Sequence, residues 1–451
     1  MNTPTALFVA PSAYVLGGLA SWLDYLLPHL RERGWNATLG LVHGPRYHLP
    51  DRYVAIHPDT NWIGIHCLTG TQKGRLLALR KVIDRLRPGL VISVNIPDAI
   101  VAASENHPTR NRPRTLLTCH GIQQDLFADM KLFSSVLDGV VCTNRLSCRL
   151  AHELGQIGDD RIFYAPYGTV GTDINTVPLN QSFTMAFVGR LEQAQKRVFD
   201  LPDILQRVVS AGHKVRLLIA GTGPEEMKLR HEFDCRGLAA HVEFLGHVDS
   251  AEMPSRVYSR ANALLVTSHW ETGPIVAWEA MSHGVPLVSS AYIGSGAEAT
   301  LIDRVNCLLF PIGDIQAAAA NIEELLISQS LRSELRKNGK ETFLRRCMIV
   351  DSVDGWHHAM LSTMQRQPAG EFVLKANPET GRLTRIFGSK IAEQIRSWTG
   401  RKPPDSGPGG EWPHTLSGDI LEDSVFWDMA SAMDRRNSDP VIASLRNASS
   451  C

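Results

Sequence analysis

Several features are scarce or missing in this chain of 451 residues, and each absence excludes a class of protein. No run of 18 or more apolar residues occurs, so we expect no membrane-spanning helix. The eight cysteines form no Cys-x-x-Cys pair and no Cys/His spacing typical of zinc, so we expect a cytoplasmic protein without a resident metal. Basic and acidic side chains number 46 each, so the chain lacks the basic excess of a nucleic-acid-binding protein.

The balanced total hides opposite charges in the two parts of the chain. Residues 1–150 carry 16 Lys and Arg against 10 Asp and Glu, which leaves 30 against 36 for residues 151–451. This asymmetry predicts two domains with different surfaces, the basic one facing an anionic partner. Within it, Lys73–Arg87 is a basic amphipathic segment that suits either an anionic membrane surface or packing on a sheet, and packing is the more usual explanation.

Short apolar runs alternate with amphipathic segments over most of the chain, which predicts an α/β protein with two doubly wound, Rossmann-like parallel sheets facing a central cleft. The expected strands are Ala6–Ala10, Ala37–Val42, Leu90–Val94, Thr115–Cys119, Gly139–Cys142, Ile162–Ala165, Met185–Val188, Val215–Ala220, Val242–Leu245, Ala263–Thr267, Pro286–Ser289 and Leu308–Phe310. The expected helices include Leu19–Arg33, Arg75–Leu86, Phe199–Ala211, Pro224–Gly237, Ile275–His283 and Ile315–Ser328.

The polar segment Asn175–Ser182 separates the two sheets, so the expected domains are residues 1–176 and 177–349. A helix within residues 350–375 follows the second sheet. The extension 376–451 holds 6 Pro and 7 Gly and is expected to be partly flexible, with helices near Leu383–Trp398 and Ile420–Met433.

Polar and glycine residues follow several expected strands, at the sheet edge where such folds bind ligands. Gly17-Gly18 stands between the first strand and helix, where a tight turn and a helix N-terminus suit phosphate, although an ordinary turn explains it equally well. Arg190, in Gly189-Arg190-Leu191, and Lys196 offer two cations for a diphosphate, or else are solvated surface charges. His120 also ends a strand, where a catalytic and a structural histidine are equally expected.

The most specific element is Ser268-His-Trp-Glu271-Thr-Gly273-Pro274-Ile275-Val276-Ala-Trp-Glu279. Gly273-Pro274 opens a helix, so Glu271 precedes that helix and Glu279 lies inside it. Two carboxylates around one helix N-terminus can accept hydrogen bonds from several hydroxyls of a polyol. Missing motifs matter too: no Asp-x-Asp follows an apolar strand, and no Gly-x-Ser-x-Gly or His-Glu-x-x-His occurs.

In this order the motifs resemble the retaining glycosyltransferases of family four, the glycosyl transferases group 1, which have the GT-B fold. Glu271 and Glu279 match the family's Glu-x7-Glu signature. Gly189-Arg190-Leu191 together with Lys196 resembles its donor-phosphate clamp, and Gly17-Gly18 resembles its N-terminal glycine loop. Ala220–Pro224 and Phe244–Val248 match further landmarks, and the similarity covers residues 5–365. Tyr167, where relatives usually carry Asn, and the loop Ala291–Glu298 depart from the pattern.

The resemblance implies a metal-independent transfer, with retention, of a sugar from a nucleotide-sugar donor to a saccharide or lipid-linked acceptor in cell-surface polysaccharide synthesis. Catalytic roles would fall on Glu271, His120, Arg190 and Lys196. The donor would be bound by Gly17, Gly18, Arg190, Lys196, Gly273, Pro274, Ile275, Val276 and Glu279. No cofactor and no nucleic acid are implied, and the basic N-terminal domain suggests contact with the inner face of the plasma membrane.

Two other functions remain open at this point. A GT-B enzyme of another class would release a free epimer or a sugar phosphate, and no motif nominates the pyridoxal-phosphate lysine of a phosphorylase. A non-catalytic module would bind a nucleotide sugar without turnover.

Overall fold

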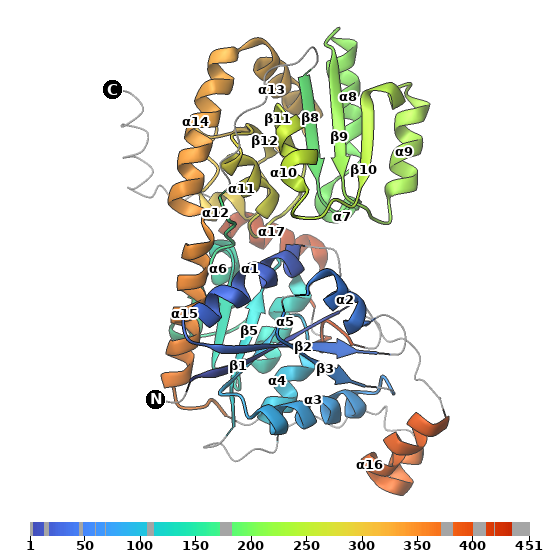
Figure 1. Ribbon diagram of the computed structural model, residues 1–451, viewed down its shortest axis with the longest axis vertical. Helices are drawn as coiled ribbons and strands as arrows, with labels where there is room; N and C mark the ends of the chain where they lie inside the picture. Colours follow the sequence, from blue (N-terminus) through green and yellow to red (C-terminus); the bar gives the residue numbers. More distant parts are fainter. Residues whose placement is uncertain are drawn as a thin grey trace. The chain divides into compact units, whose positions relative to one another are not determined.

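The computed structural model describes residues 3–12, 18–44, 48–58, 60–67, 69–105, 112–171, 183–370, 382–399, 412–418 and 420–434. The chain divides into two compact units (Figure 1). Unit 1 consists of Met1–Thr143, Ser147–Ala165 and Ser352–Asp423, and unit 2 of Asn144–Leu146, Pro166–Asp351 and Ser424–Cys451. The predicted boundary at residues 176 and 177 lies outside the described residues.

Unit 1 contains a seven-stranded sheet in the order β3-β2-β1-β4-β5-β6-β7, with every neighbouring pair parallel. Its strands are β1 (Thr5–Ala10), β2 (Asn36–His43), β3 (Trp62–His66), β4 (Leu90–Ser93), β5 (Arg114–Cys119), β6 (Gly139–Cys142) and β7 (Ile162–Tyr164). The helices between them are α1 (Gly18–Glu32), α2 (Pro50–Ile56), α3 (Gln72–Leu86), α4 (Asp98–Ser104), α5 (Gln124–Phe133) and α6 (Arg145–Glu153), with the 3-10 turn η1 (Asp159–Arg161).

Unit 2 repeats this plan with a six-stranded parallel sheet in the order β10-β9-β8-β11-β12-β13. Its strands are β8 (Phe183–Val188), β9 (Val215–Ala220), β10 (Val242–Gly246), β11 (Ala263–Val266), β12 (Leu287–Ser290) and β13 (Leu308–Phe310). Its helices are α7 (Gln193–Lys196), α8 (Asp200–Ser210), α9 (Glu226–Cys235), α10 (Met253–Arg256), α11 (Ile275–Ser282), α12 (Ser295–Glu298), α13 (Ile315–Ile327) and α14 (Gln329–Arg346), with 3-10 turns η2 (Ala239–His241) and η3 (Tyr258–Arg260).

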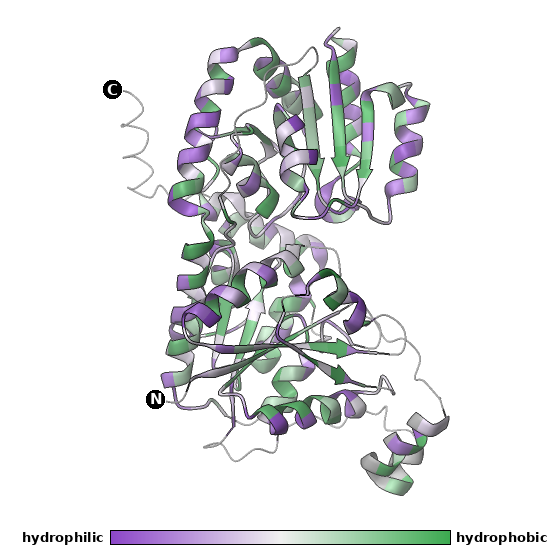
Figure 2. Ribbon diagram, in the orientation of Figure 1, coloured by the Kyte–Doolittle hydropathy of each residue, from purple (hydrophilic) through white to green (hydrophobic). Residues whose placement is uncertain are grey.

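Both sheets are buried on two faces, as the near-continuous apolar strands predict. In β8, Met185 and Phe187 belong to the cluster that includes residues of α8 and α13, and Ala186 belongs to the opposite cluster with residues of α11. Figure 2 shows the strands β8 and β9 largely hydrophobic and the outer helix α14 rich in hydrophilic residues. The structure therefore confirms the predicted class of two doubly wound parallel sheets.

Each predicted strand is present, but β3 was not predicted. Its sequence Trp-Ile-Gly-Ile-His is short and has a glycine at its centre, and glycine is depleted in strands. It lies at the edge of the sheet and pairs with β2 alone. An edge strand is less buried than a central one, so it needs fewer apolar residues. Helix α14 was also missed, because eight of its 18 residues are charged and few apolar residues mark a buried face.

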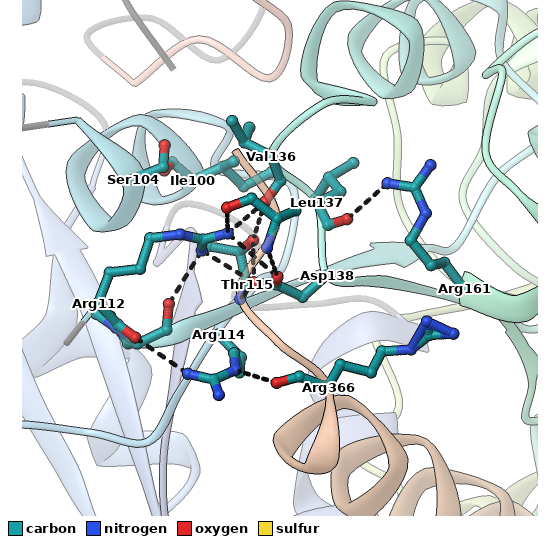
Figure 3. Close-up of polar contacts among 12 residues, drawn as sticks. Ile100, Ser104, Arg112, Arg114, Thr115, Val136, Leu137, Asp138, Arg161 and Arg366 are labelled. Carbon is teal, nitrogen blue, oxygen red and sulfur yellow. Dashed lines mark hydrogen bonds and ion pairs between the residues drawn. The ribbon is translucent and has the colours of Figure 1, made fainter. Parts of the chain in front are cut away.

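Helix α15 (Ile349–Gln365) leads the chain back into unit 1, where the segment after it joins a buried ion pair (Figure 3). Both Arg112 and Asp138 are fully buried, with Nη1 of Arg112 2.9 Å from Oδ2 of Asp138. Arg112 also donates to the carbonyl of Ala369, whose own N–H donates to Asp138. Thr115, the second residue of β5, donates its N–H to Asp138, so the cluster lies at the amino-terminal edge of the sheet, away from the edge where ligands bind.

The C-terminal extension contributes to each unit separately. The indole of Trp412, fully buried, donates to the carbonyl of His43 in unit 1. The predicted helices of the extension are present as α16 (Arg382–Thr399) and α17 (Asp423–Met433), the latter beginning three residues later than expected at Ile420. The predicted Pro/Gly-rich linker 402–410 lies outside the described residues. Among the described helices, none is sufficiently long and apolar to cross a membrane.

Candidate functional site

In unit 2 the strand order reverses between β8 and β11, and the proposed donor residues follow the carboxyl ends of these two strands. A doubly wound sheet leaves a crevice at such a reversal, because the connections on its two sides run to opposite faces. Gly189-Arg190-Leu191 leaves β8, and Thr267 to Glu271 leaves β11. The topology alone thus brings two motifs 80 residues apart in sequence to neighbouring positions.

The Gly189–Leu191 loop is held against the loop Gly221–Gly223 that follows β9. Gly189 donates to the carbonyl of Ala220, and Leu191 to that of Thr222, at 3.0 and 2.9 Å. A Cβ on Gly221 would lie 1.9 Å from the carbonyl oxygen of Gly189, so only glycine permits this approach. Arg190 is an exposed residue of this double loop, and its side chain makes no hydrogen bond or ion pair within the described ranges.

Glu271 lies at the centre of a polar cluster, with only 6% of its surface exposed. Its Oε1 is 2.5 Å from Nζ of Lys196 and accepts a hydrogen bond of 2.6 Å from Oγ of Ser268. Nε2 of Gln195 donates to its Oε2 over 3.3 Å. The carboxylate is therefore fixed in orientation by three side-chain donors, one of them charged.

The backbone around this cluster is bound from two sides. The N–H of His269 donates to the carbonyl of Gln195, and Oγ1 of Thr267 donates to the carbonyl of Lys196. On the other side, the N–H of Glu271 donates to the carbonyl of Ile293, and the N–H of Ile293 to that of His269. The loop 267–271 is therefore rigidly positioned by α7 and by the segment that follows β12.

Glu279 lies on α11 and points toward η3, where the hydroxyl of Tyr258 donates to its Oε2 over 2.6 Å. Burial raises the pKa of Glu279, and the hydrogen bond from Tyr258 partly opposes this rise. Tyr258 in turn stacks on the ring of His283, with centroids 4.8 Å apart. A carboxylate held in this way has accepting capacity left for the hydroxyls of a ligand.

Gly273, Pro274, Ile275 and Val276 form the turn into α11. Gly273 has φ of +135°, a conformation that favours glycine, and a Cβ there would lie 3.1 Å from Cδ2 of Tyr167. Pro274 is the N-cap residue, and no described side chain caps the helix. The first N–H groups of α11 are thus available to a ligand oxygen.

In unit 1 the strand order reverses between β1 and β4. Gly18 is the first residue of α1, and Gly17 lies outside the described residues. His120 follows β5 and contacts Trp22 edge-on, with ring centroids 4.4 Å apart. Burial lowers the pKa of His120 to about 3, so the ring is neutral at physiological pH.

Of the predicted residues, Lys196 and Glu271 are joined by an ion pair, and Arg190, Glu279 and the turn 273–276 belong to the same unit 2. Gly18 and His120 belong to unit 1. Sequence reasoning missed Tyr258, Ser268 and Gln195 as partners of the two glutamates. Ser268 stands inside the quoted motif Ser268–Glu279, and Gln195 directly precedes Lys196, so their positions offered a signal. Tyr258 offered none, because its place opposite Glu279 depends on how η3 packs on α11.

Comparisons with known proteins agree with this arrangement. Residues 174–342 match the family model described as glycosyl transferases group 1. The capsular polysaccharide biosynthesis glycosyltransferase CapM of Staphylococcus aureus is 28% identical over 165 residues, 36% of this chain and 42% of that protein. A phosphatidyl-myo-inositol mannosyltransferase of Mycobacterium leprae is 33% identical over 162 residues, 36% of this chain and 42% of that protein.

Solved structures show the same fold. A glycosyltransferase from Rickettsia africae has a TM-score of 0.67 at 14% identity, covering 81% of this chain and 100% of that one. HepE of Anabaena, in complex with UDP and glucose, has a TM-score of 0.66 at 18% identity. The match covers 80% of this chain and 100% of that one.

The two sheets and the site at the reversal of the second define a GT-B glycosyltransferase fold. Residues 174–342 are similar in sequence to the glycosyl transferases group 1. The match spans about two fifths of the length of the curated relatives named above.

Proposed function

We propose that this protein is a retaining, metal-independent glycosyltransferase that moves a sugar from a nucleotide-sugar donor to a saccharide or lipid-linked acceptor. The observation that carries the proposal is the cluster of Glu271, Lys196, Ser268 and Gln195 beside the exposed Arg190. It supplies two cations for a leaving diphosphate, Lys196 held by Glu271 and Arg190 exposed, and a fixed carboxylate for sugar hydroxyls.

Departure of a nucleoside diphosphate gathers negative charge on the phosphate oxygens while the sugar ring becomes positive. Arg190 and Lys196 stabilise the leaving diphosphate, and the N-terminus of α11 adds partial positive charge. Because these groups are already in place, the chain can stabilise the diphosphate without a metal ion, and no cofactor is needed.

Glu271 and Glu279 have different tasks in this mechanism. Glu271 accepts hydrogen bonds from donor-sugar hydroxyls and keeps Lys196 oriented through their ion pair. Glu279, oriented by Tyr258, accepts hydrogen bonds from ribose hydroxyls of the nucleotide. His120, neutral through burial, donates or accepts a hydrogen bond at the sugar and transfers no proton at pH 7.

The test is a screen of sugar nucleotides, beginning with UDP-sugars, with product analysis by mass spectrometry and NMR. A glycoside that keeps the donor's anomeric configuration supports the proposal, and full activity after chelation supports the metal-independent mechanism. A free epimer or a sugar phosphate would instead indicate the other reaction classes. Calorimetric binding of a nucleotide sugar without turnover on any acceptor would indicate a binding module.

Glu271→Gln keeps the shape of the side chain but removes the charge that pairs with Lys196. We expect its kcat to fall on the order of 10²-fold or more, as for other deletions of a fixed electrostatic group. Glu334→Gln serves as a control, because Glu334 is an exposed carboxylate of α14. Equal activity of Glu271→Gln and the wild type would remove Glu271 from the mechanism.

We also propose peripheral contact of unit 1 with the inner, anionic face of the plasma membrane, where a lipid-linked acceptor and cell-surface polysaccharide synthesis would be found. In α3 the apolar side chains Leu76, Leu79, Val82 and Ile83 are buried, so this helix offers its exposed cations rather than an apolar face. Helix α16 supports the proposal from the extension: Ile386 and Trp398 are 71% and 79% exposed, and Phe387 and Ile391 are exposed too. Exposed apolar and aromatic side chains insert at the lipid interface.

Flotation with vesicles containing 30% anionic lipid would measure this contact. We expect binding that salt weakens and that Trp398→Ser with Ile386→Ser reduces. Met227→Ser, which removes an exposed apolar side chain of unit 2, is the matched control. Equal flotation with and without the two substitutions would assign no role to α16.

A further inference from the structure

Helix α17 lies in the C-terminal extension, beyond the residues 174–342 that match the family model, yet it packs on the donor site of unit 2. Phe426 and Ala430 are buried and anchor the helix. Trp427 and Asp434 are seven residues apart, two helical turns, so they project from the same side of the segment. Each contacts a different loop of the site.

Trp427 contacts the loop that carries Glu271. Its ring stacks nearly parallel to that of Trp270, with centroids 6.3 Å apart and an angle of 27°. It also lies against His269, with centroids 4.9 Å apart. Trp270 immediately precedes Glu271, so the stacking limits movement of the backbone from which the carboxylate projects.

Asp434 contacts the loop that follows β12. Its carboxylate, on a side chain that is almost fully buried, accepts three backbone hydrogen bonds: from Gly294 at 2.8 Å, Gly296 at 3.2 Å and Ala297 at 2.8 Å. An acidic side chain at the C-terminal end of a helix is electrostatically unfavourable for that helix. Its three charge-assisted hydrogen bonds offset this cost, which indicates that the contact stabilises the loop.

The two loops are joined to each other through Ile293. Its carbonyl accepts from the N–H of Glu271, and its N–H donates to His269. Gly294, the next residue, is the one that Asp434 binds. A short path of hydrogen bonds therefore leads from Asp434 through Gly294 and Ile293 to the backbone of Glu271.

We propose that Trp427 and Asp434 are positioning residues of the donor site, through which the C-terminal extension fixes the loops 268–273 and 293–297. The proposal rests on the function proposed above for this site. The pair touches no reacting atom in the mechanism, and it acts by holding Glu271 and its partners in the geometry that the donor requires.

Three variants test the contact from both sides. Asp434→Asn keeps the volume but turns a donor group toward backbone N–H groups, and Trp427→Ala removes the stacked ring. Gly296→Ala disrupts the contact from the side of the loop, because the added Cβ would lie 2.0 Å from the carbonyl oxygen of Asp434. Asp428→Asn on the exposed side of α17 is the matched control.

We expect each variant to raise KM for the donor on the order of tenfold, the change that corresponds to the loss of one good hydrogen bond. Trp427→Phe should restore KM to within about twofold. A variant that merely lowers the folded fraction would reduce kcat at unchanged KM. Amide hydrogen exchange of the segment 291–299 should speed up severalfold in Asp434→Asn and stay unchanged in Asp428→Asn.

The exchange measurement needs no substrate, so it separates this inference from the proposed function. If no sugar nucleotide is turned over but Asp434→Asn loosens the loop, the function fails and the contact stands. Wild-type KM and wild-type exchange in both Asp434→Asn and Trp427→Ala would overturn the positioning role.

Discussion

At the residue scale, the hydrogen bond from Tyr258 to Glu279 controls the charge of a buried carboxylate. That hydrogen bond lowers the pKa of Glu279 against the raising effect of burial. In Tyr258→Phe we expect the pKa of Glu279 to rise further, so that the carboxylate becomes protonated at a higher pH than in the wild type.

The consequence is measurable as the pH dependence of donor KM. We expect the acidic limb of the profile, where KM rises as Glu279 is protonated, to move to higher pH in Tyr258→Phe. Tyr25→Phe in α1 of unit 1 is the comparison. An acidic limb at the same pH in wild type and Tyr258→Phe would show that Glu279 does not control donor binding.

The buried pair Arg112–Asp138 makes a prediction for stability rather than activity. Arg112→Met would leave the carboxylate of Asp138 buried without its cation, which typically costs about 3–5 kcal/mol. Arg256→Ala breaks an exposed pair with Glu252 and should cost about 0–1 kcal/mol. Denaturant unfolding of both variants would measure the difference, and equal costs would contradict the structural role of the buried pair.

At the scale of elements, α5 and the segment 412–418 form a contact that depends on pH. Asp129 accepts hydrogen bonds from the N–H groups of Leu416 and Ser417, and burial raises its pKa to about 7. The unfolded chain releases this proton near the ordinary value for aspartate, about 4. Between these two values the folded state binds more protons, so stability falls as pH rises from about 4 to about 7 and levels off above.

Thermal unfolding between pH 4 and 8 would test this. We expect the midpoint to fall less steeply with pH in Asp129→Asn, which cannot titrate, than in the wild type. Asp84→Asn, at an exposed position of α3, is the control. Parallel pH profiles of wild type and Asp129→Asn would show that Asp129 does not titrate in this range.

Elements also show what the sequence could and could not predict. The strands β8 and β11 could be predicted from the sequence, because a strand buried on both faces forms a continuous run of apolar residues. The edge strand β3 and the charged helix α14 could not be predicted, since each packs against the rest of the unit on one side only and shows a weak apolar pattern. Arg190, Lys196, Glu271 and Glu279 were predicted as site residues because they follow strand ends and glycine turns.

At the scale of the whole molecule, the partners of those residues were beyond sequence reasoning. The contacts of Trp427 and Asp434 join residues more than 130 positions apart, and nothing in the extension marks them as parts of a site. The charge asymmetry predicted two domains, but it did not locate the donor cations, which lie in the acidic part of the chain. Local motifs thus predicted the candidate site, and only the fold shows which residues support it.

The central claim is that Arg190 stabilises the diphosphate that leaves the donor sugar. The most direct measurement is the rate of nucleotide release from the preferred sugar nucleotide by wild type, Arg190→Ala and Arg207→Ala, an exposed cation of α8. The account predicts that kcat falls on the order of 10²-fold in Arg190→Ala and stays at the wild-type value in Arg207→Ala. Wild-type kcat in Arg190→Ala would contradict it.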